Sequence, residues 1–406
     1  MNYKAEKNFI FHNIFDDLFV LELANNHWGK PERGLKIISD YSQVVRFNNV
    51  RAAIKLQIRD VENFIHKQFR DRDDIRYIKK TRETVLSRAD FVLLVDAIRK
   101  GGCIPMATPF DEHSVDLCME LGIEILKLAS SDINDWILIE KIAKTKKPVI
   151  ASTGGASEKD TDDLVTFFHN RGIPLALNHC VSVYPSEDSE LELNQIDYLR
   201  ERYPGLTIGF STHEYHDWSS SIMIAVAKGA RTFERHIDID DGTTALAPYN
   251  SLPEQIDQWF KSFKKAVEMS GQPGIRKRNL PRKEIAYLDA LVRGIYLREN
   301  LAAGHVLCDE DVYLAIPLLR GQVSCREFMR GEKLLHPVLK DDPLLIDCIE
   351  SPYSADSTLR AAIYERGLAS SENQVHVCGA VAPQKASRNL GPSSLPQAPA
   401  KQEHLI

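Results

Sequence analysis

Short apolar runs alternate with amphipathic stretches of helical length from residue 19 to about residue 270. This alternation is the pattern of βα units around a parallel sheet, and it constrains the fold more than any other feature. The expected strands cover residues 19–23, 51–57, 103–108, 124–130, 148–152, 174–180, 206–211 and 231–237. Eight such repeats in about 250 residues match the size of a TIM (β/α)8 barrel. We therefore predict an α/β chain with a TIM barrel.

A doubly wound open sheet is the main alternative for a chain of alternating strands and helices. That fold would need a glycine-rich phosphate turn after its first strand. Residues 23–27 read LANNH, which contains no glycine. The barrel is therefore the favoured interpretation.

The remaining chain divides by composition. Glycine, proline and clustered cations in residues 271–283 predict an exposed linker after the barrel. We expect a barrel domain at 1–275, a linker at 276–288 and a small domain of short strands at 289–350. Residues 351–406 contain much Pro, Ala, Ser and Gln but few large apolar side chains. Such a segment buries too little surface to offset its ordering entropy, so we expect a disordered tail.

Composition excludes several classes of protein. Lys plus Arg number 51 and Asp plus Glu 57, so the net charge of -6 excludes the strongly basic surface of a nucleic-acid binder. No apolar run approaches the roughly 20 residues that span a bilayer, and the first residues lack the apolar segment of a signal peptide. We expect a cytoplasmic protein with neither nucleic-acid nor membrane partners. Seven cysteines without a CxxC pair favour reduced thiols over a disulfide framework or a zinc site.

Two lysines stand inside apolar strands, at positions 55 and 127. In a TIM barrel the catalytic groups project from the carboxyl ends of the strands. A buried ammonium without a partner is costly, so each lysine should meet an anion. That anion is either an internal carboxylate, Glu22 or Glu234, or a ligand phosphate or carboxylate. The neighbouring Ser, Thr and Gly residues favour the ligand, although the Ser-Thr-Gly-Gly turn at 152–155 is also an ordinary strand-to-helix junction.

Two histidines end neighbouring expected strands, at positions 213 and 236. Their imidazoles could converge on one divalent metal ion, with Glu22 or water completing its shell. His216 is a rival partner for His213, because three residues separate them on a helix. The acidic residues between 238 and 241 are better explained as a solvated loop.

These residues, in this order, resemble the sialic acid synthase family, the N-acetylneuraminate synthases that condense phosphoenolpyruvate with an amino sugar. The matching stretches are ELANNHWG (22–29), AIKLQ (53–57), ATPF (107–110), LKLASSD (126–132), ASTGG (151–155), HCVSVYP (179–185), IGFSTH (208–213) and FERH (233–236). Residues 289–350 resemble the antifreeze-like (SAF, β-clip) domain that is attached to these synthases. The resemblance thus implies a barrel followed by an SAF domain.

The resemblance also implies roles for individual positions. It implies catalytic roles for Glu22, Lys55, Lys127 and Asp132. It implies substrate-binding roles for Gln57, Thr108, Phe110, Ser130, Ser152, Gly154, Ser182, Tyr184 and Ser211. Among these, Gln57 and Tyr184 match positions that line the sugar site, whereas the lysines and hydroxyls match the phosphoenolpyruvate site. His213 and His236 match the ligands of a divalent metal ion, usually manganese or magnesium.

The implied reaction forms a carbon–carbon bond. The metal polarises the aldehyde of an open-chain sugar, carbon 3 of phosphoenolpyruvate attacks it, and water adds at carbon 2. The intermediate then expels phosphate and leaves a 2-keto-3-deoxy acid. The family further implies a domain-swapped homodimer in which the SAF domain caps the partner's barrel. Two other hypotheses are a non-catalytic relative that binds a sugar or phosphorylated ligand, and a lyase with a Schiff-base lysine.

Three positions depart from the family, and the last two of them concern the sugar. Asp132 stands where the family has Glu, and Ala247 stands where an Asp of a Pro-Gly-Pro-Asp turn holds sugar hydroxyls. Residues 315–318 replace a Lys-Arg-Pro-Gly segment, so Ile316 stands in place of an Arg, with Arg320 as a nearby substitute. A site usually rejects an analogue that leaves its buried polar groups unpaired. We therefore expect recognition of phosphoenolpyruvate and metal to be kept, with an aldehyde other than N-acetylmannosamine.

Overall fold

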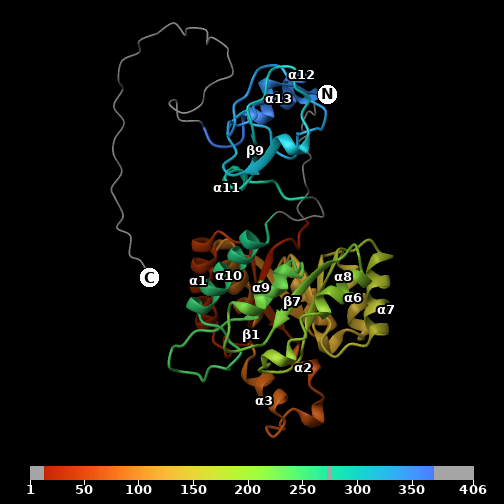
Figure 1. Ribbon diagram of the computed structural model, residues 1–406. Coiled ribbons are helices and arrows are strands. Elements are labelled where there is room, and N and C mark those ends of the chain that lie inside the picture. Colours follow the sequence, from red (N-terminus) through yellow and green to blue (C-terminus); the bar gives the residue numbers. More distant parts are fainter. Residues whose placement is uncertain (1–12, 272–276, 370–406) are drawn as a thin grey trace. The chain divides into compact units, whose positions relative to one another are not determined.

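The computed structural model describes residues 13–271 and 277–369 of the chain (Figure 1). It consists of two compact units, Met1–Pro273 and Gly274–Ile406. The expected disorder of residues 370–406 lies outside the described residues.

The first unit is a closed barrel of eight parallel strands in sequence order. The strands are β1 (Leu18–Ala24), β2 (Ala52–Ile58), β3 (Ile104–Pro109), β4 (Ile125–Leu128), β5 (Val149–Ser152), β6 (Leu175–Cys180), β7 (Thr207–Thr212) and β8 (Thr232–His236). β8 pairs in parallel with β1, from Leu18 opposite Thr232 to Glu22 opposite His236, and this pairing closes the barrel. The predicted TIM barrel is confirmed, and the open sheet is excluded.

Helices follow the strands and cover the outside of the barrel (Figure 1). They are α1 (Pro31–Asn48), α4 (Arg88–Lys100), α5 (Glu112–Glu120), α6 (Trp136–Lys144), α7 (Glu158–His169), α8 (Gln195–Arg202), α9 (Ser220–Ala227) and α10 (Pro253–Ser270). Capping boxes at Ser87 and Ser157 begin α4 and α7, because each hydroxyl accepts a hydrogen bond from the backbone three residues on. Between β2 and α4 the chain makes an excursion through α2 (Val61–Phe64) and α3 (Arg76–Glu83).

The alternation of side chains along each strand separates two apolar layers. Phe19, Leu21 and Leu23 of β1 face the helices, where Phe19 packs 4.7 Å from the ring of Phe260 in α10. Leu18 and Val20 face the barrel interior and join a second cluster at its floor. Glu22 continues this inward row, as do Lys55 on β2, Lys127 on β4 and Glu234 on β8. The strand period therefore places a charged layer above an apolar floor.

The second unit contains two short antiparallel pairs. β9 (Gly294–Leu297) pairs with β10 (Val312–Ala315), and β11 (Lys333–Leu334) pairs with β12 (Ile349–Glu350). Their apolar side chains form one core around Ile295, Leu297, Val323 and Ile346.

Helices correct two of the expected boundaries in this unit. α11 (Arg282–Asp289) occupies most of the expected linker at 276–288. α12 (Pro352–Ala355) and α13 (Ser357–Tyr364) lie in the expected tail, and Ile363 of α13 is buried in the core. The carboxylate of Asp356 caps α13 by accepting from the backbone of Thr358 and Leu359. Composition missed α12 and α13 because side-chain caps and the single buried Ile363 are enough to order elements so short.

The described residues also test two expectations drawn from composition. None of the helices among them is long and apolar enough to cross a membrane. Five of the cysteines are free thiols, at positions 103, 118, 180, 308 and 325. Cys348 is disulfide-bonded, so the expectation of reduced thiols is wrong at that position.

Candidate active site

A buried layer of charges lies at the centre of the barrel mouth. Nζ of Lys55 lies 2.6 Å from Oε1 of Glu234 and 3.2 Å from Oε2 of Glu22. Nζ of Lys127 lies 3.8 Å from Oε2 of Glu234 and donates a 2.7 Å hydrogen bond to Oγ of Ser152. Both lysines therefore meet internal carboxylates. This is the first of the two partners that the sequence suggested, the other being a ligand anion. These pairs offset the charge of the two cations.

The carboxyl groups of Glu22 and Glu234 in this layer differ in pKa. Burial raises the pKa of Glu22, and this effect outweighs the attraction of Lys55. Burial would raise the pKa of Glu234 as well, but Lys127 and Lys55 together lower it to about 2. Neighbouring carboxyl groups with separated pKa values can divide acid–base work. Glu22 is thus the group suited to exchange a proton, whereas Glu234 stays ionised.

Hydroxyl groups converge beside Lys127, over the turn that follows β5. The amide of Gly154 donates a 3.2 Å hydrogen bond to Oγ of Ser130. A Cβ at position 154 would lie 2.3 Å from Oγ of Ser182 and 2.9 Å from Oγ of Ser130, so a side chain there would displace both hydroxyls. Ser211 lies opposite Cys180 in the β6–β7 register, at the same end of the barrel. We call Ser130, Ser152, Gly154, Ser182 and Ser211 the hydroxyl cradle.

The two predicted metal ligands lie together at the ends of β7 and β8. The ring centroids of His213 and His236 are 5.4 Å apart. Tyr184 covers His213 with its ring centroid 3.8 Å away, and Tyr249 lies 5.1 Å from His236. Burial lowers the pKa of His213 to about 4, and desolvation together with the charge of His213 lowers that of His236 well below its ordinary value. Both rings are therefore neutral at pH 7, the state in which imidazole binds metals.

The hydrogen bonding of His213 fits a metal ligand. Its Nδ1 lies 2.9 Å from the carbonyl oxygen of Val181. A carbonyl only accepts, so Nδ1 carries the proton and Nε2 keeps its lone pair for a cation. No third His, Cys, Asp or Glu completes a metal-binding group with the pair among residues 13–271 and 277–369. Glu22 is engaged with Lys55 and Gln57 instead, so water or substrate would have to complete the shell.

The rival metal candidates lie elsewhere. His216 is exposed and pairs with Asp188 at 3.2 Å. Asp238 and Asp241 bind the guanidinium of Arg33, with Nη2 of Arg33 2.8 Å from Oδ1 of Asp238. The expectation of a solvated acidic loop is therefore wrong for Asp238, which is buried.

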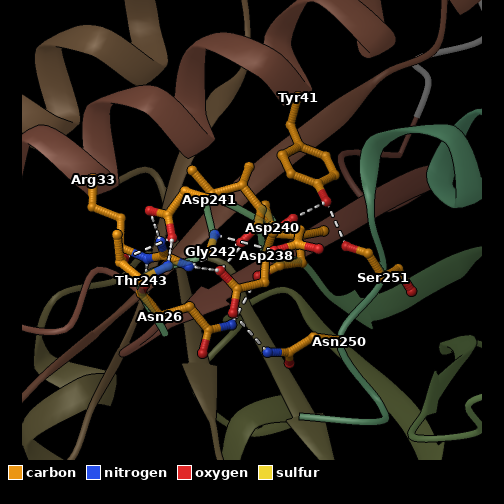
Figure 2. A network of polar contacts seen from close by, with 12 residues as sticks. Asn26, Arg33, Tyr41, Asp238, Asp240, Asp241, Gly242, Thr243, Asn250 and Ser251 are labelled. Carbon is orange, nitrogen blue, oxygen red and sulfur yellow. Dashed lines mark hydrogen bonds and ion pairs between the residues drawn. The ribbon is translucent and has the colours of Figure 1, made fainter. Parts of the chain in front are cut away.

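Figure 2 shows the polar network around Arg33, which anchors the segment after β8. Nε of Arg33 donates to the carbonyl of Asn26 at 2.8 Å, while Asp238 accepts from Nδ2 of Asn250 at 3.0 Å. The hydroxyl of Tyr41 donates to the carbonyl of Asp238 at 2.6 Å. The network fixes both ends of the loop 239–249, which carries Ala247 and Tyr249 to the mouth.

The remaining predicted residues surround a cation that sequence reasoning missed. Gln57 donates to Oε1 of Glu22 at 2.7 Å and accepts from Nη1 of Arg59 at 3.1 Å. The guanidinium of Arg59 lies 3.6 Å from the ring centroid of Phe110 and acts electrostatically on Asp132. Arg59 directly follows β2, and this position at the carboxyl end of a strand could have identified it from the sequence. Thr108 is buried opposite Gln57 in the β2–β3 register.

A cavity of about 530 Å³ adjoins the histidine pair. Tyr184 and Tyr249, which contact both imidazoles, also line this cavity. Its other walls come from Trp28, α3 and the loop that holds Ala247. The mouth thus offers a cradle suited to an anion, a histidine pair and an adjoining cavity.

The closed barrel and this mouth agree with the class of phosphoenolpyruvate-condensing synthases, to which the family match assigns the chain. The chain belongs to the NeuB family, whose family model matches residues 48–273.

Relatives support this assignment over most of the chain. A solved protein described as spore coat polysaccharide biosynthesis protein E from Chromobacterium violaceum is 37% identical, with a TM-score of 0.78, over 82% of this chain and 99% of that chain. The N-acetylneuraminate-9-phosphate synthase of Drosophila melanogaster is 24% identical over 82% of this chain and 96% of its own length. The N,N'-diacetyllegionaminic acid synthase of Campylobacter jejuni is 26% identical over 70% of this chain and 89% of its own length.

Proposed function

We propose that the chain condenses phosphoenolpyruvate with an open-chain sugar aldehyde and releases phosphate and a 2-keto-3-deoxy sugar acid. One observation carries the proposal: the buried Lys55 and Lys127 layer, the hydroxyl cradle and the histidine pair all open into one barrel mouth. The first two suit a small polyanion, and the third suits a metal-bound carbonyl. Membership of the NeuB family supports the same reaction type.

In this proposal Lys127 and the cradle hold phosphoenolpyruvate. The phosphate receives hydrogen bonds from the hydroxyls of Ser130 and Ser182 and from the amide of Gly154, which now bonds Ser130. Lys127 shifts from its 3.8 Å contact with Glu234 towards the incoming anion. Donors fixed in advance around a buried anion stabilise the charge that moves onto phosphate during the reaction.

Glu22 serves as the proton-exchanging group, since its pKa is raised by burial. Gln57 holds its Oε1 at 2.7 Å and so fixes the direction of the carboxyl group. Water adds to carbon 2 as the new bond forms, and a nearby carboxylate can accept the proton that this water loses. Lys55 lies between Glu22 and Glu234 and forms an ion pair with each of them.

His213 and His236 would hold the divalent ion, Mn²⁺ or Mg²⁺. When bound, such an ion polarises the carbonyl oxygen of the aldehyde. The neutral rings and the fixed tautomer of His213 fit this role. Mn²⁺ binding can be followed by electron paramagnetic resonance without turnover, and His236→Ala should weaken it.

The sugar differs from N-acetylmannosamine in this proposal. Ala247 lines the cavity and offers no hydrogen-bonding side chain, and the shorter Asp132 lies beside Arg59. Relatives named for N-acetylneuraminate 9-phosphate and for N,N'-diacetyllegionaminic acid support variation of the sugar within the family. We further propose that the second unit is an SAF domain that caps the barrel of a partner in a domain-swapped homodimer.

Turnover with a panel of sugars tests the proposal. The protein is incubated with phosphoenolpyruvate, Mn²⁺ and aldoses, and phosphate release is measured together with the product masses. We expect sugar-dependent release that Lys127→Met abolishes. Lys141→Met is the matched control, because this lysine pairs with Asp116 at 2.6 Å outside the proposed site. No release from folded, Mn²⁺-loaded protein across the panel would refute the synthase and favour a non-catalytic binding protein.

A further inference from the structure

The cavity beside the histidine pair lies on one side of the barrel mouth. Trp28 follows β1, α3 follows β2, and Tyr249 belongs to the segment after β8. The hydroxyl cradle is carried mainly by the segments after β4, β5 and β6, on the other side of the closed barrel. His213 and His236, at the ends of β7 and β8, lie between the two. A ligand in the cavity would therefore reach the histidine pair from the side opposite the cradle.

Three carboxylates and three cations line this cavity, but the carboxylates do not pair with all of these cations. Each of the three lining carboxylates has a partner: Asp73 pairs with Arg82, Asp74 with Arg72, and Glu83 with Lys79. Two other cations of α3, Arg76 and Lys80, also line the cavity. Neither forms an ion pair with a carboxylate among residues 13–271 or 277–369.

Lys80 is the more enclosed of these two cations. Its side chain is half-buried, and Nζ lies 5.6 Å from the ring centroid of Trp28. Burial lowers the pKa of Lys80, and the positive charges of Arg76 and Arg59 lower it further. Like charges gathered on a concave wall repel one another and attract an anion from solution.

On the basis of the proposed synthase activity, we propose that the aldehyde substrate carries an anionic group, a carboxylate or a phosphate, remote from its aldehyde carbon. Arg76 and Lys80 bind this group while the aldehyde lies at His213 and His236. The rings of Trp28, Tyr184 and Tyr249 pack against the carbon skeleton. Ala247 adds no further carboxylate to a wall whose three carboxylates already have cationic partners.

Matched substrates and two variants test this inference. The substrates are mannose, mannose 6-phosphate and mannuronate, each with phosphoenolpyruvate and Mn²⁺. We expect kcat/KM for one anionic sugar to exceed that of mannose at least tenfold. Comparison of mannose 6-phosphate with mannuronate shows whether the preferred group is a phosphate or a carboxylate. Arg76→Met and Lys80→Met should each raise KM for that sugar roughly tenfold, the value of one charge-assisted contact. KM for phosphoenolpyruvate should not change.

Lys67→Met is the control, since Lys67 is exposed on the same β2–β3 connection and does not line the cavity. Preference for mannose, or a rise in KM for phosphoenolpyruvate in the Arg76 and Lys80 variants, overturns the inference and leaves the synthase standing. If no aldehyde reacts, the synthase fails, and calorimetric titration with the two anionic sugars decides. Binding that both variants weaken supports an anion site, and no binding to the unaltered protein overturns it.

Discussion

Nη1 of Arg235 lies 2.6 Å from Oε1 of Glu214, and neither side chain has any solvent exposure. Arg235 precedes His236 on β8, and Glu214 follows His213 after β7. Because side chains alternate along a strand, this ion pair lies outside the barrel while the histidines face its mouth. Arg235 also donates to Oγ of Ser251 at 2.7 Å. The pair therefore holds together the two strand ends that carry the histidines.

Removing one member of this pair should destabilise the barrel strongly. Arg235→Met leaves the carboxylate of Glu214 buried without its partner, and such losses cost about 3–5 kcal/mol. Chemical denaturation should show this fall in the unfolding free energy. Lys261→Met removes an exposed pair with Asp257 and should change it by less than about 0.5 kcal/mol. Equal stability of the two variants would contradict a positioning role for Arg235.

His27 should make the barrel sensitive to acid. Burial lowers its pKa to about 4, from an ordinary value of 6.5, and its Nδ1 accepts a 3.1 Å hydrogen bond from the amide of Gly29. Between these two values the unfolded chain binds a proton that the folded chain does not. Stability from the neutral ring is therefore complete above pH 6.5 and is lost as the pH falls towards 4, by about 3 kcal/mol in total.

Denaturation curves at several pH values check this expectation with His27→Gln. The variant should lose stability at pH 7 but show a shallower decline between pH 6.5 and 4. Other buried histidines, such as His179, contribute in the same direction and remain in the variant. An unchanged slope would show that His27 does not titrate in this window.

The alternation of eight strand-like and helix-like segments predicted the barrel. The position of Lys55 and Lys127 inside apolar strands predicted that each would meet an anion, but the internal candidates Glu22 and Glu234 were not favoured over a ligand. The sequence could not predict which charges would pair, because that depends on barrel closure between β8 and β1. Arg59 follows β2 directly and Arg76 begins α3; both were missed because the segment between β2 and α4 is extra to the eight-repeat pattern, which does not place it.

Glu22→Gln should separate activity from stability. Glutamine keeps the shape of the side chain and an oxygen that can accept from Gln57, but it cannot exchange a proton. We expect kcat to fall by roughly 10²-fold or more, the usual value of a general acid or base. Because burial opposes the charge of Glu22, the unfolding free energy should change little. A large loss of stability with normal turnover would instead assign Glu22 a structural role.

Gly154→Ala should block the hydroxyl cradle. The new methyl group would lie 2.3 Å from Oγ of Ser182 and 2.9 Å from Oγ of Ser130, in the space proposed for the phosphate. We expect KM for phosphoenolpyruvate to rise at least tenfold. The hydroxyls must move apart, and they then no longer point at the phosphate. Initial rates at saturating aldehyde measure this change, and KM for the aldehyde should be less affected.

Gly155→Ala is the matched control at the next position. Gly155 has a φ of +72°, and no atom lies within 4 Å of a Cβ built there. Alanine at this position should cost about 1–2 kcal/mol of stability through backbone strain, without entering the cradle. If both variants raise KM for phosphoenolpyruvate equally, distortion of the turn explains the effect. If only Gly154→Ala does so, the hydroxyls around Gly154 hold the substrate's anion.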